Sequence, residues 1–187
     1  MRVRLIQKSK VWHIIPWITE KNLGRFYNEA MNLVGDEDWI CFLDGDAVHT
    51  TTYFGRNIEE IIEKNPEYGM FTCRTNKVLC PYQLYDGFVT NQDMDYHRKI
   101  GKEAWEKYST QVLDITKEKK KIGGVLLCVR KRSWKIIGGF KEEKMLGIDN
   151  DAQERCEKYG LKLGLMLGIY VQHWYRGDDI KNKEHLL

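Results

Sequence analysis

Short apolar runs alternate with amphipathic stretches along the first third of the chain. Residues 11–15 form an apolar run closed by Pro16, which predicts a strand that ends in a loop. Phe26, Ala30 and Leu33 then recur with helical spacing, so residues 24–34 are expected to form an amphipathic helix ended by Gly35.

The next apolar run is almost uninterrupted and stops at an acidic turn. Residues 38–43 are typical of a parallel strand buried on both faces, and Asp44-Gly45-Asp46 follows directly. In open α/β sheets, ligands bind at the carboxyl ends of the strands. Isoleucines within residues 58–62 predict a second helix, and residues 69–73 predict the next strand, so the order begins β-α-β-α-β.

The middle of the chain is less regular than its two ends. Residues 74–121 show no sustained period and are interpreted as a variable region of loop and helix. Residues 123–129 then predict a buried strand, a short helix follows at 131–137, a last helix contains Ala152 and Cys156, and the strand 162–172 leads to His173. The alternation predicts a three-layer α/β fold in one domain over residues 1–187.

Composition narrows the class of protein without naming its function. The chain has 187 residues, 42% of them apolar, which is enough for a core, and 30 basic against 27 acidic residues give a net charge of only +3. This balance does not favour a dedicated nucleic-acid or membrane-surface protein, and we find no specific nucleic-acid motif. The longest apolar stretch falls short of the roughly 20 residues of a membrane-spanning helix.

Cysteines and the N-terminus bear on the compartment. The five cysteines are odd in number and widely spaced, which favours buried reduced thiols over a disulfide framework. The N-terminal apolar patch is short and no small-residue cleavage site follows it, so it does not resemble a signal peptide. We therefore expect a cytoplasmic protein with no integral membrane segment.

Asp-x-Asp is a weak signal here unless its context selects one copy. Only Asp44-Gly45-Asp46 follows an apolar strand, and the glycine between its carboxylates lets a ligand approach closely. The motif occurs four times, at Asp36/Asp38, Asp44/Asp46, Asp93/Asp95 and Asp149/Asp151. A solvated turn is the alternative. His173, at the end of the last strand, could reach the same edge, and carboxylates with an imidazole suit a transition ion such as manganese. By itself, a lone histidine is more often structural.

A third acidic segment precedes the last helix. Asn150 or Asp151 could cap that helix, a structural role, and this would leave Asp149 free. A carboxylate held there could accept a proton from a substrate hydroxyl, as a general base does.

Taken in order, these segments resemble glycosyltransferases of the GT-A fold, namely the family 2 enzymes and the C-terminal half of the β-1,4-galactosyltransferases. The resemblance covers more than half the chain, in the stretches IIP at 14–16, EKNLGRFYNEAMNLV at 20–34, DWICFLDGDA at 38–47, IGGVLLCVRKRSWKIIGGFKEE at 122–143, GIDNDAQERCEKYG at 147–160 and HWYR at 173–176. It implies a mixed, mostly parallel sheet flanked by helices, and transfer of a sugar from a nucleotide diphosphate, UDP foremost, to an unidentified hydroxyl acceptor, with inversion.

The resemblance also implies roles for individual residues. Nucleotide-sugar contacts would come from Ile15, Pro16, Asn22, Gly24, Asn28, Asp44, Gly45 and Asp46. Asp44, Asp46 and His173 would hold Mn²⁺ or Mg²⁺. Acceptor contacts would come from Gly123, Gly124, Asp149 and Asp151, with Asp149 as the catalytic base and the variable region 74–121 shaping the acceptor site.

Two departures from the family pattern keep other functions open. Ile148 stands where the family has a Glu before the catalytic Asp, and only residues 17–21 fill an interval that usually holds a helix and a strand. The nucleotide-binding half is thus abbreviated, and Trp17 could stack on the base in its place. A catalytically impaired nucleotide-sugar or glycan-binding module and a nucleotidyltransferase are the alternatives.

Overall fold

The computed structural model describes residues 10–17, 22–142 and 146–174. The strands are β1 (Val11–Ile14), β2 (Trp39–Leu43), β3 (Ala47–His49), β4 (Tyr68–Thr75), β5 (Val112–Asp114), β6 (Leu126–Arg130) and β7 (Lys162–His173). The helices are α1 (Leu23–Asn32), α2 (Phe54–Lys64), α3 (Met94–Tyr108), α4 (Lys131–Ile137) and α5 (Ile148–Lys158), with a 3₁₀ turn, η1, at Pro81–Gln83. Residues 20–21, 143 and 175–176 of the motif stretches lie outside the described part of the chain.

The strands form one open mixed sheet in the order β1-β2-β6-β4-β7-β3, with β5 also paired to β7. Among the described strands, β1–β2 and β4–β7 pair in parallel, whereas β2–β6, β4–β6, β3–β7 and β5–β7 pair antiparallel. The expectation of a mixed sheet is confirmed, but a mostly parallel one is wrong. A strand buried on both faces has the same apolar pattern in either direction, so the sequence could not reveal the direction.

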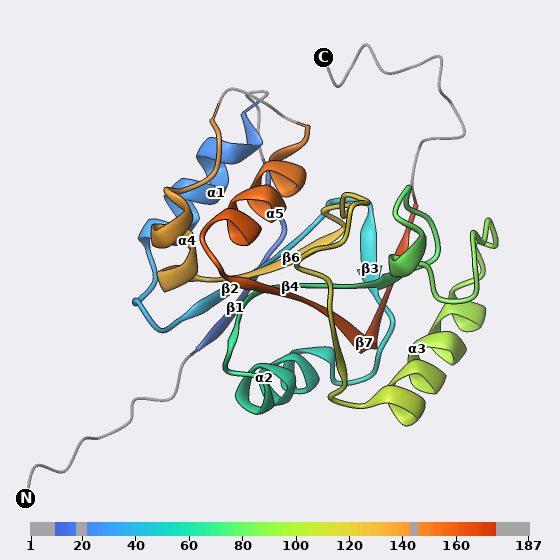
Figure 1. The fold of residues 1–187 in the computed structure, drawn as a ribbon. Coiled ribbons are helices and arrows are strands. Elements are labelled where there is room, and N and C mark those ends of the chain that lie inside the picture. The colour runs from blue at the N-terminus through green and yellow to red at the C-terminus, as the bar shows by residue number, and fades with distance from the viewer. Residues whose placement is uncertain (1–9, 18–21, 143–145, 175–187) are drawn as a thin grey trace, which may run out of the picture.

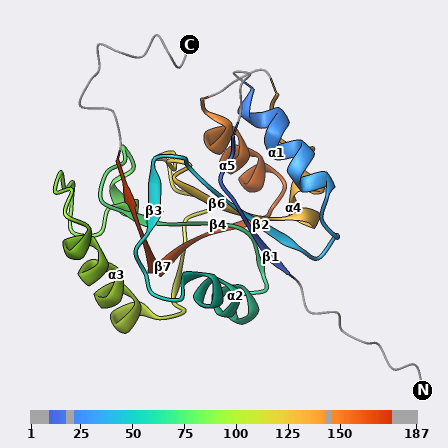
Figure 2. The same cartoon turned by 180° about the vertical axis from the view of Figure 1, so that it is seen from behind.

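Helices cover both faces of the sheet, as the two opposite views show (Figures 1 and 2). Alternate residues of β2 divide between the layers: Ile40 and Phe42 pack with α1, α4 and α5, while Trp39, Cys41 and Leu43 pack with α2. The three-layer α/β architecture expected from the sequence is therefore confirmed.

The variable region, interpreted as loop and helix, contains one long regular helix whose position the sequence pattern did not predict. Helix α3 is 15 residues long, and the residues it buries include His97, Gly101 and Ala104 beside Ile100. Because small and polar residues form most of that buried face, no apolar period marks it. The short strand β3 was also missed, since a three-residue strand is too short to show alternation.

The thiols agree with the expectation from the sequence. All five cysteines are buried and unbridged. Within the described residues, no helix is both long enough and apolar enough to cross a membrane.

Candidate functional site

Two strand ends bring three candidate metal ligands together. Asp44 and Asp46 follow β2, and His173 is the last residue of β7. The antiparallel pairing of β3 with β7 sets Ala47 opposite His173, which brings Asp46 beside the imidazole. One ligand atom from each of Asp44, Asp46 and His173 lies within 4.8 Å of the others. His173 thus lies beside Asp44 and Asp46, the Asp-x-Asp copy that the sequence context had selected.

Hydrogen bonds fix the orientation of the His173 ring. Its Nδ1 lies 2.8 Å from the carbonyl oxygen of Lys77. A carbonyl can only accept, so Nδ1 carries the proton and donates. Nε2 then faces Asp46, with 3.4 Å to Oδ1. In metal sites, a histidine commonly donates one ring N–H to a backbone carbonyl, and this bond directs the other ring nitrogen toward the metal. His173 has the same arrangement, with its Nε2 directed toward the carboxylates.

The backbone of His173 is held as firmly as its ring. The Asn76 side-chain oxygen accepts from the His173 N–H at 2.7 Å, and its Nδ2 donates to the His173 carbonyl at 3.2 Å. Asn76 is almost fully buried at 1% exposure. This residue lies in the variable region, so that region helps to build the candidate metal site as well as any acceptor site.

Electrostatics at the cluster favour a cation. Burial raises the pKa of Asp44 to about 7; His173 opposes the rise, while Asp46 and Asp149 add to it. Burial alone would lower the pKa of His173, but its hydrogen bond with Asp46 and its charge interactions with both aspartates raise it. Two carboxylates and an imidazole so close together form a donor set that fits Mn²⁺, and also Mg²⁺ through the carboxylates.

Asp149 lies in the same electrostatic neighbourhood as this cluster. Its charge raises the pKa of Asp44. Burial is the main cause of the raised pKa of the Tyr27 hydroxyl, and the charges of Asp44 and Asp149 add to it. Burial raises the pKa of Asp149, although hydrogen bonds from backbone N–H groups, including that of Gly124, oppose the rise. A half-buried carboxylate with a raised pKa near a candidate metal site is a candidate general base.

The helix that carries Asp149 begins earlier than expected. Helix α5 starts at Ile148, and its N-cap is Gly147 with a φ of 83°, so neither Asn150 nor Asp151 caps it. Asp149 therefore lies inside the first turn, and its Oδ1 accepts from the Asn150 N–H at 2.9 Å. The predicted cap was wrong because Gly147, in the left-handed region, turns the chain two residues before Asp149, where the acidic run begins.

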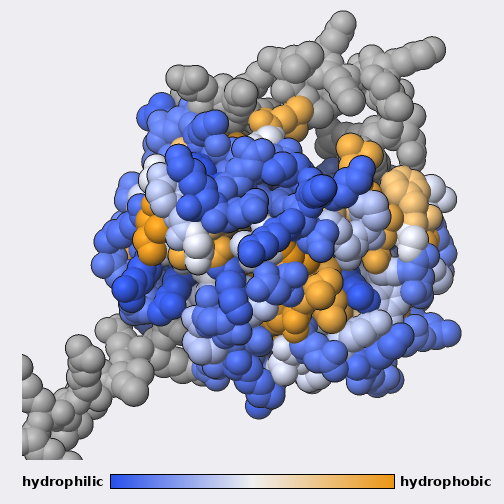
Figure 3. Space-filling model, viewed as in Figure 1, coloured by the Kyte–Doolittle hydropathy of each residue, from blue (hydrophilic) through white to orange (hydrophobic). Residues whose placement is uncertain are grey.

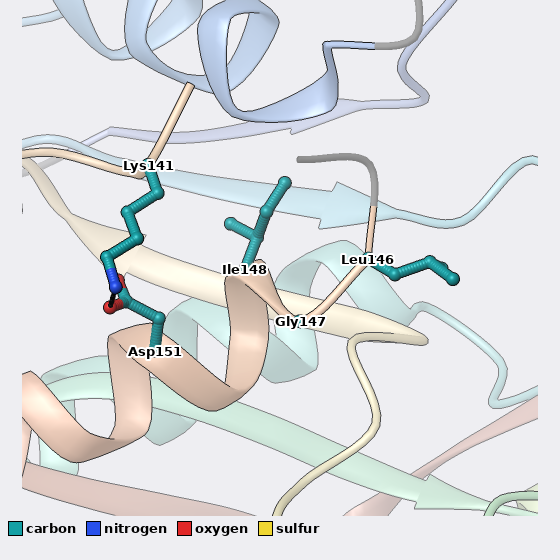
Figure 4. Close-up of a pocket in the computed structure, with 5 residues that line it drawn as sticks. All are labelled: Lys141, Leu146, Gly147, Ile148 and Asp151. Atoms are coloured by element: carbon teal, nitrogen blue, oxygen red, sulfur yellow. Dashed lines mark ion pairs between the residues drawn. The ribbon is translucent and has the colours of Figure 1, made fainter. Parts of the chain in front are cut away.

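Asp151 forms ion pairs within the protein. Its carboxylate lies 2.7 Å from the Lys141 ammonium and also pairs with Arg155, and its side chain is 13% exposed. Figure 4 shows Lys141 and Asp151 facing each other beside a small pocket of about 80 Å³ at the start of α5. The acceptor contact expected of Asp151 would therefore have to compete with these ion pairs.

Of the two glycines expected at the acceptor site, Gly124 lies against the candidate base Asp149 and Gly123 lies against Val78. A Cβ on Gly124 would stand 3.3 Å from the Asp149 carboxylate, and one on Gly123 would overlap Val78. Gln83 holds this loop, accepting from the Gly123 N–H at 2.7 Å and donating to the Gly123 carbonyl at 3.1 Å. Gln83 is fully buried, and sequence reasoning missed it because it lies in the variable region.

Three residues expected to line the nucleotide site also have structural partners. Asn22 caps α1 by accepting from the Arg25 N–H. A Cβ on Gly24 would overlap the carbonyl oxygen of Lys141. Asn28 donates to the Phe140 carbonyl and to Glu142, and its oxygen accepts from Trp134 and from the Phe140 N–H. Gly24 and Asn28 join α1 to the loop 139–142, and a nucleotide contact by Asn28 would have to replace one of its bonds.

Strand β1 ends near the acidic turn. The parallel register pairs its last residue, Ile14, with Phe42, two residues before Asp44. Ile15 and Trp17 are exposed at 61% and 86%. Gly45 leaves open space, since a Cβ there would meet nothing within 4 Å. The residues expected to contact the nucleotide from β1 and from the acidic turn therefore share one edge of the sheet.

Comparisons with known proteins leave the chain without an assigned family. No known protein family matches its sequence. A search of curated proteins finds no similar sequence either. The functional argument therefore depends on the geometry of the site.

Proposed function

We propose that this chain is a metal-dependent glycosyltransferase of the GT-A fold, which moves a sugar from a nucleotide diphosphate donor, UDP foremost, to an acceptor hydroxyl. One observation carries the proposal: Asp44, Asp46 and His173 gather within 4.8 Å at strand ends of an open α/β sheet, and the half-buried Asp149 interacts electrostatically with Asp44. Strand ends of such sheets are where ligands bind.

Asp44, Asp46 and His173 would hold a divalent ion, Mn²⁺ or Mg²⁺. When bound, the ion supplies positive charge that stabilises the diphosphate as a leaving group. The protein contributes the placement of the three ligands. The Lys77 carbonyl and Asn76 fix the histidine before any ligand arrives, so little reorganisation is needed on binding.

Asp149 is proposed to take the proton from the acceptor hydroxyl. Its raised pKa makes the carboxylate a stronger base than an exposed aspartate. The bond from the Asn150 N–H and the contact with Gly124 hold its carboxylate in place. A hydroxyl activated there would attack the anomeric carbon on the face opposite the leaving nucleotide, which inverts the configuration.

The nucleotide is proposed to lie on the β1 side of the cluster. Strand β1 ends opposite Phe42, two residues before Asp44, and Ile15 and Trp17 offer exposed apolar surface for a base. The open space over Gly45 would let the sugar–phosphate portion approach the backbone.

Calorimetric titration of the full chain with UDP, GDP and ADP, each with Mn²⁺ and with chelator, tests the metal and nucleotide roles. We expect UDP to bind with Mn²⁺ and to lose most of its affinity with chelator. Asp46→Asn should weaken binding by about 10- to 100-fold, because a ligand oxygen is replaced by a neutral amide. Asp95→Asn is the matched control, since Asp95 belongs to another Asp-x-Asp and its side chain is 87% exposed. Equal, weak binding of all three nucleotides with and without metal would refute the proposal.

A further inference from the structure

An exposed aromatic side chain lies beside the candidate metal cluster at the end of β7. Trp174 follows His173 and is 51% exposed. The backbone N–H of Trp174 donates to the backbone carbonyl of Asp46 at 2.9 Å. This bond extends the β3–β7 ladder by one pair beyond Ala47 and His173. Residues directly opposite in such a ladder have Cβ atoms about 4.5–5.5 Å apart. Trp174 and Asp46 are therefore immediate neighbours.

The segment that carries Trp174 is anchored just before it. Asn76 bonds both backbone groups of His173, and the Lys77 carbonyl accepts from the His173 ring. Trp174 itself adds the bond to Asp46. An aromatic side chain on so constrained a backbone is preorganised, so a ligand that contacts it loses little conformational entropy.

The position of Trp174 separates it from the proposed site of the base. The base is proposed to lie on the Asp44 side of the cluster, by β1, whereas Trp174 lies on the Asp46 side, where β7 pairs with β3 and not with β1. Figure 3 shows a mostly hydrophilic face on which several separate groups of apolar residues are exposed. A ligand group on this side has to combine an apolar face for the indole with polar groups for the aspartates.

A pyranose ring has that combination. One of its faces presents C–H groups, which are attracted to the negative face of an aromatic ring, and its rim carries hydroxyls. We propose that Trp174 is a stacking platform for a pyranose ring held beside Asp46. The inference rests on the proposed function, and it makes a saccharide the substrate class on this side of the site. The ring belongs either to the donor sugar or to a saccharide acceptor.

Trp12 provides a matched control for an experiment on Trp174. Trp12 is 46% exposed, lies on β1 and donates from Nε1 to Asp38 at 3.4 Å, away from the cluster. The full chain and its variants Trp174→Ala, Trp174→Phe and Trp12→Ala are titrated with UDP, UDP-glucose and UDP-galactose in Mn²⁺. Saturation-transfer NMR then measures binding of methyl glucoside, galactoside and N-acetylglucosaminide, with and without UDP.

The two sources of the ring give different results. If the donor sugar stacks, Trp174→Ala weakens a UDP-sugar about tenfold and leaves UDP within about twofold. If an acceptor sugar stacks, Trp174→Ala abolishes transfer to a methyl pyranoside and leaves the UDP-sugars unchanged. In both cases Trp174→Phe retains part of the binding, because it keeps an aromatic face, and Trp12→Ala behaves as the unaltered chain.

Other results overturn the inference. Unchanged binding of every sugar in Trp174→Ala, an equal loss for UDP and UDP-sugars, or the same loss in Trp12→Ala would each show that Trp174 is no sugar platform. If UDP fails to bind the unaltered chain, the proposed function fails. Saturation-transfer NMR of the methyl pyranosides without UDP then tests the inference on Trp174 separately. Pyranoside binding that is lost in Trp174→Ala supports the inference, and the absence of such binding refutes it.

Discussion

At the scale of single residues, the candidate site gathers acidic groups that repel one another. Asp44 has a pKa of about 7 because it is buried and has Asp46 and Asp149 as neighbours. Below that pH its proton offsets the repulsion, and above it a cation can do so. The residues that suit a divalent ion are thus the ones that make the site electrostatically unfavourable without one.

His49 gives a pH-dependent test of a residue outside the site. Burial and the nearby His13 lower its pKa to about 4, and its Nδ1 is buried without a hydrogen-bond partner. Between pH 6.5 and 4 the unfolded chain therefore binds a proton that the folded chain does not, and the free energy of unfolding falls as the pH falls. His49→Phe should keep the stacking on Phe54, at 3.7 Å between ring centroids, and remove this loss.

Urea unfolding at pH 7.5 and pH 4.5 measures the effect. We expect the unaltered chain to lose up to about 3 kcal/mol more than His49→Phe between these pH values, from the size of the pKa shift. Parallel pH dependence of the two proteins would show that His49 does not couple folding to protonation.

The sequence predicted the site residues that stand at strand ends and missed those that hold other site residues in place by hydrogen bonds. Asp44, Asp46 and His173 each stand at a predicted strand end, so strand ends alone suggested that they meet, as they do. Asn76 and Gln83 could not be found in this way. Their importance comes from partners 97 and 40 residues away, and no local pattern records such a bond.

At the scale of elements, α1 and the loop 139–142 are joined through close backbone contact. Gly24 lies against the Lys141 carbonyl, and Asn28 bonds Phe140 on both its N–H and its carbonyl. The resemblance to the glycosyltransferase family implied nucleotide contacts for Asn22, Gly24 and Asn28. Their spacing also serves a helix that packs on a loop, so sequence alone could not separate the two roles.

Substitution of Gly24 tests this junction. Gly24→Ala should destabilise the protein by about 1–3 kcal/mol, because the added methyl would overlap the Lys141 carbonyl and force the loop away. Gly45→Ala is the control, since a methyl there meets nothing within 4 Å. Thermal unfolding of both variants gives the comparison, and equal melting temperatures would show that α1 and the loop do not pack as described.

Elements with a strong apolar period were the ones predicted well. Strand β2 and helix α1 match their sequence patterns closely because their buried faces are apolar. Helix α3 buries His97 against Tyr170, with 2.8 Å from Nδ1 to the hydroxyl, and so lacks a readable apolar stripe. Strand direction was misjudged because pairing partners, which lie far apart in sequence, decide it.

At the scale of the whole molecule, the three-layer fold brings distant segments to one edge of the sheet. Strand β2 leads into the acidic turn, β7 ends at the histidine, and α5 carries the half-buried Asp149. Helices α1, α4 and α5 cover one face of the sheet, and α2 and α3 cover the other (Figure 1). A mixed sheet makes this gathering of segments possible, because the antiparallel β3–β7 pair brings the end of β7 back to Asp46.

The central claim, metal-dependent sugar transfer with Asp149 as base, is tested most directly by release of UDP from UDP-sugars. The assay contains Mn²⁺ and a mixture of methyl pyranosides as acceptors. If no pyranoside is used, water serves as the acceptor and the UDP-sugar is hydrolysed. Asp149→Asn should reduce turnover by about 10²- to 10⁴-fold with donor affinity unchanged, because it removes only the base. Asp151→Asn should retain turnover and lose about 1–2 kcal/mol of stability through its weakened ion pairs. Near-normal turnover in Asp149→Asn, turnover that chelator leaves unchanged, or a product that keeps the donor's anomeric configuration would contradict this account.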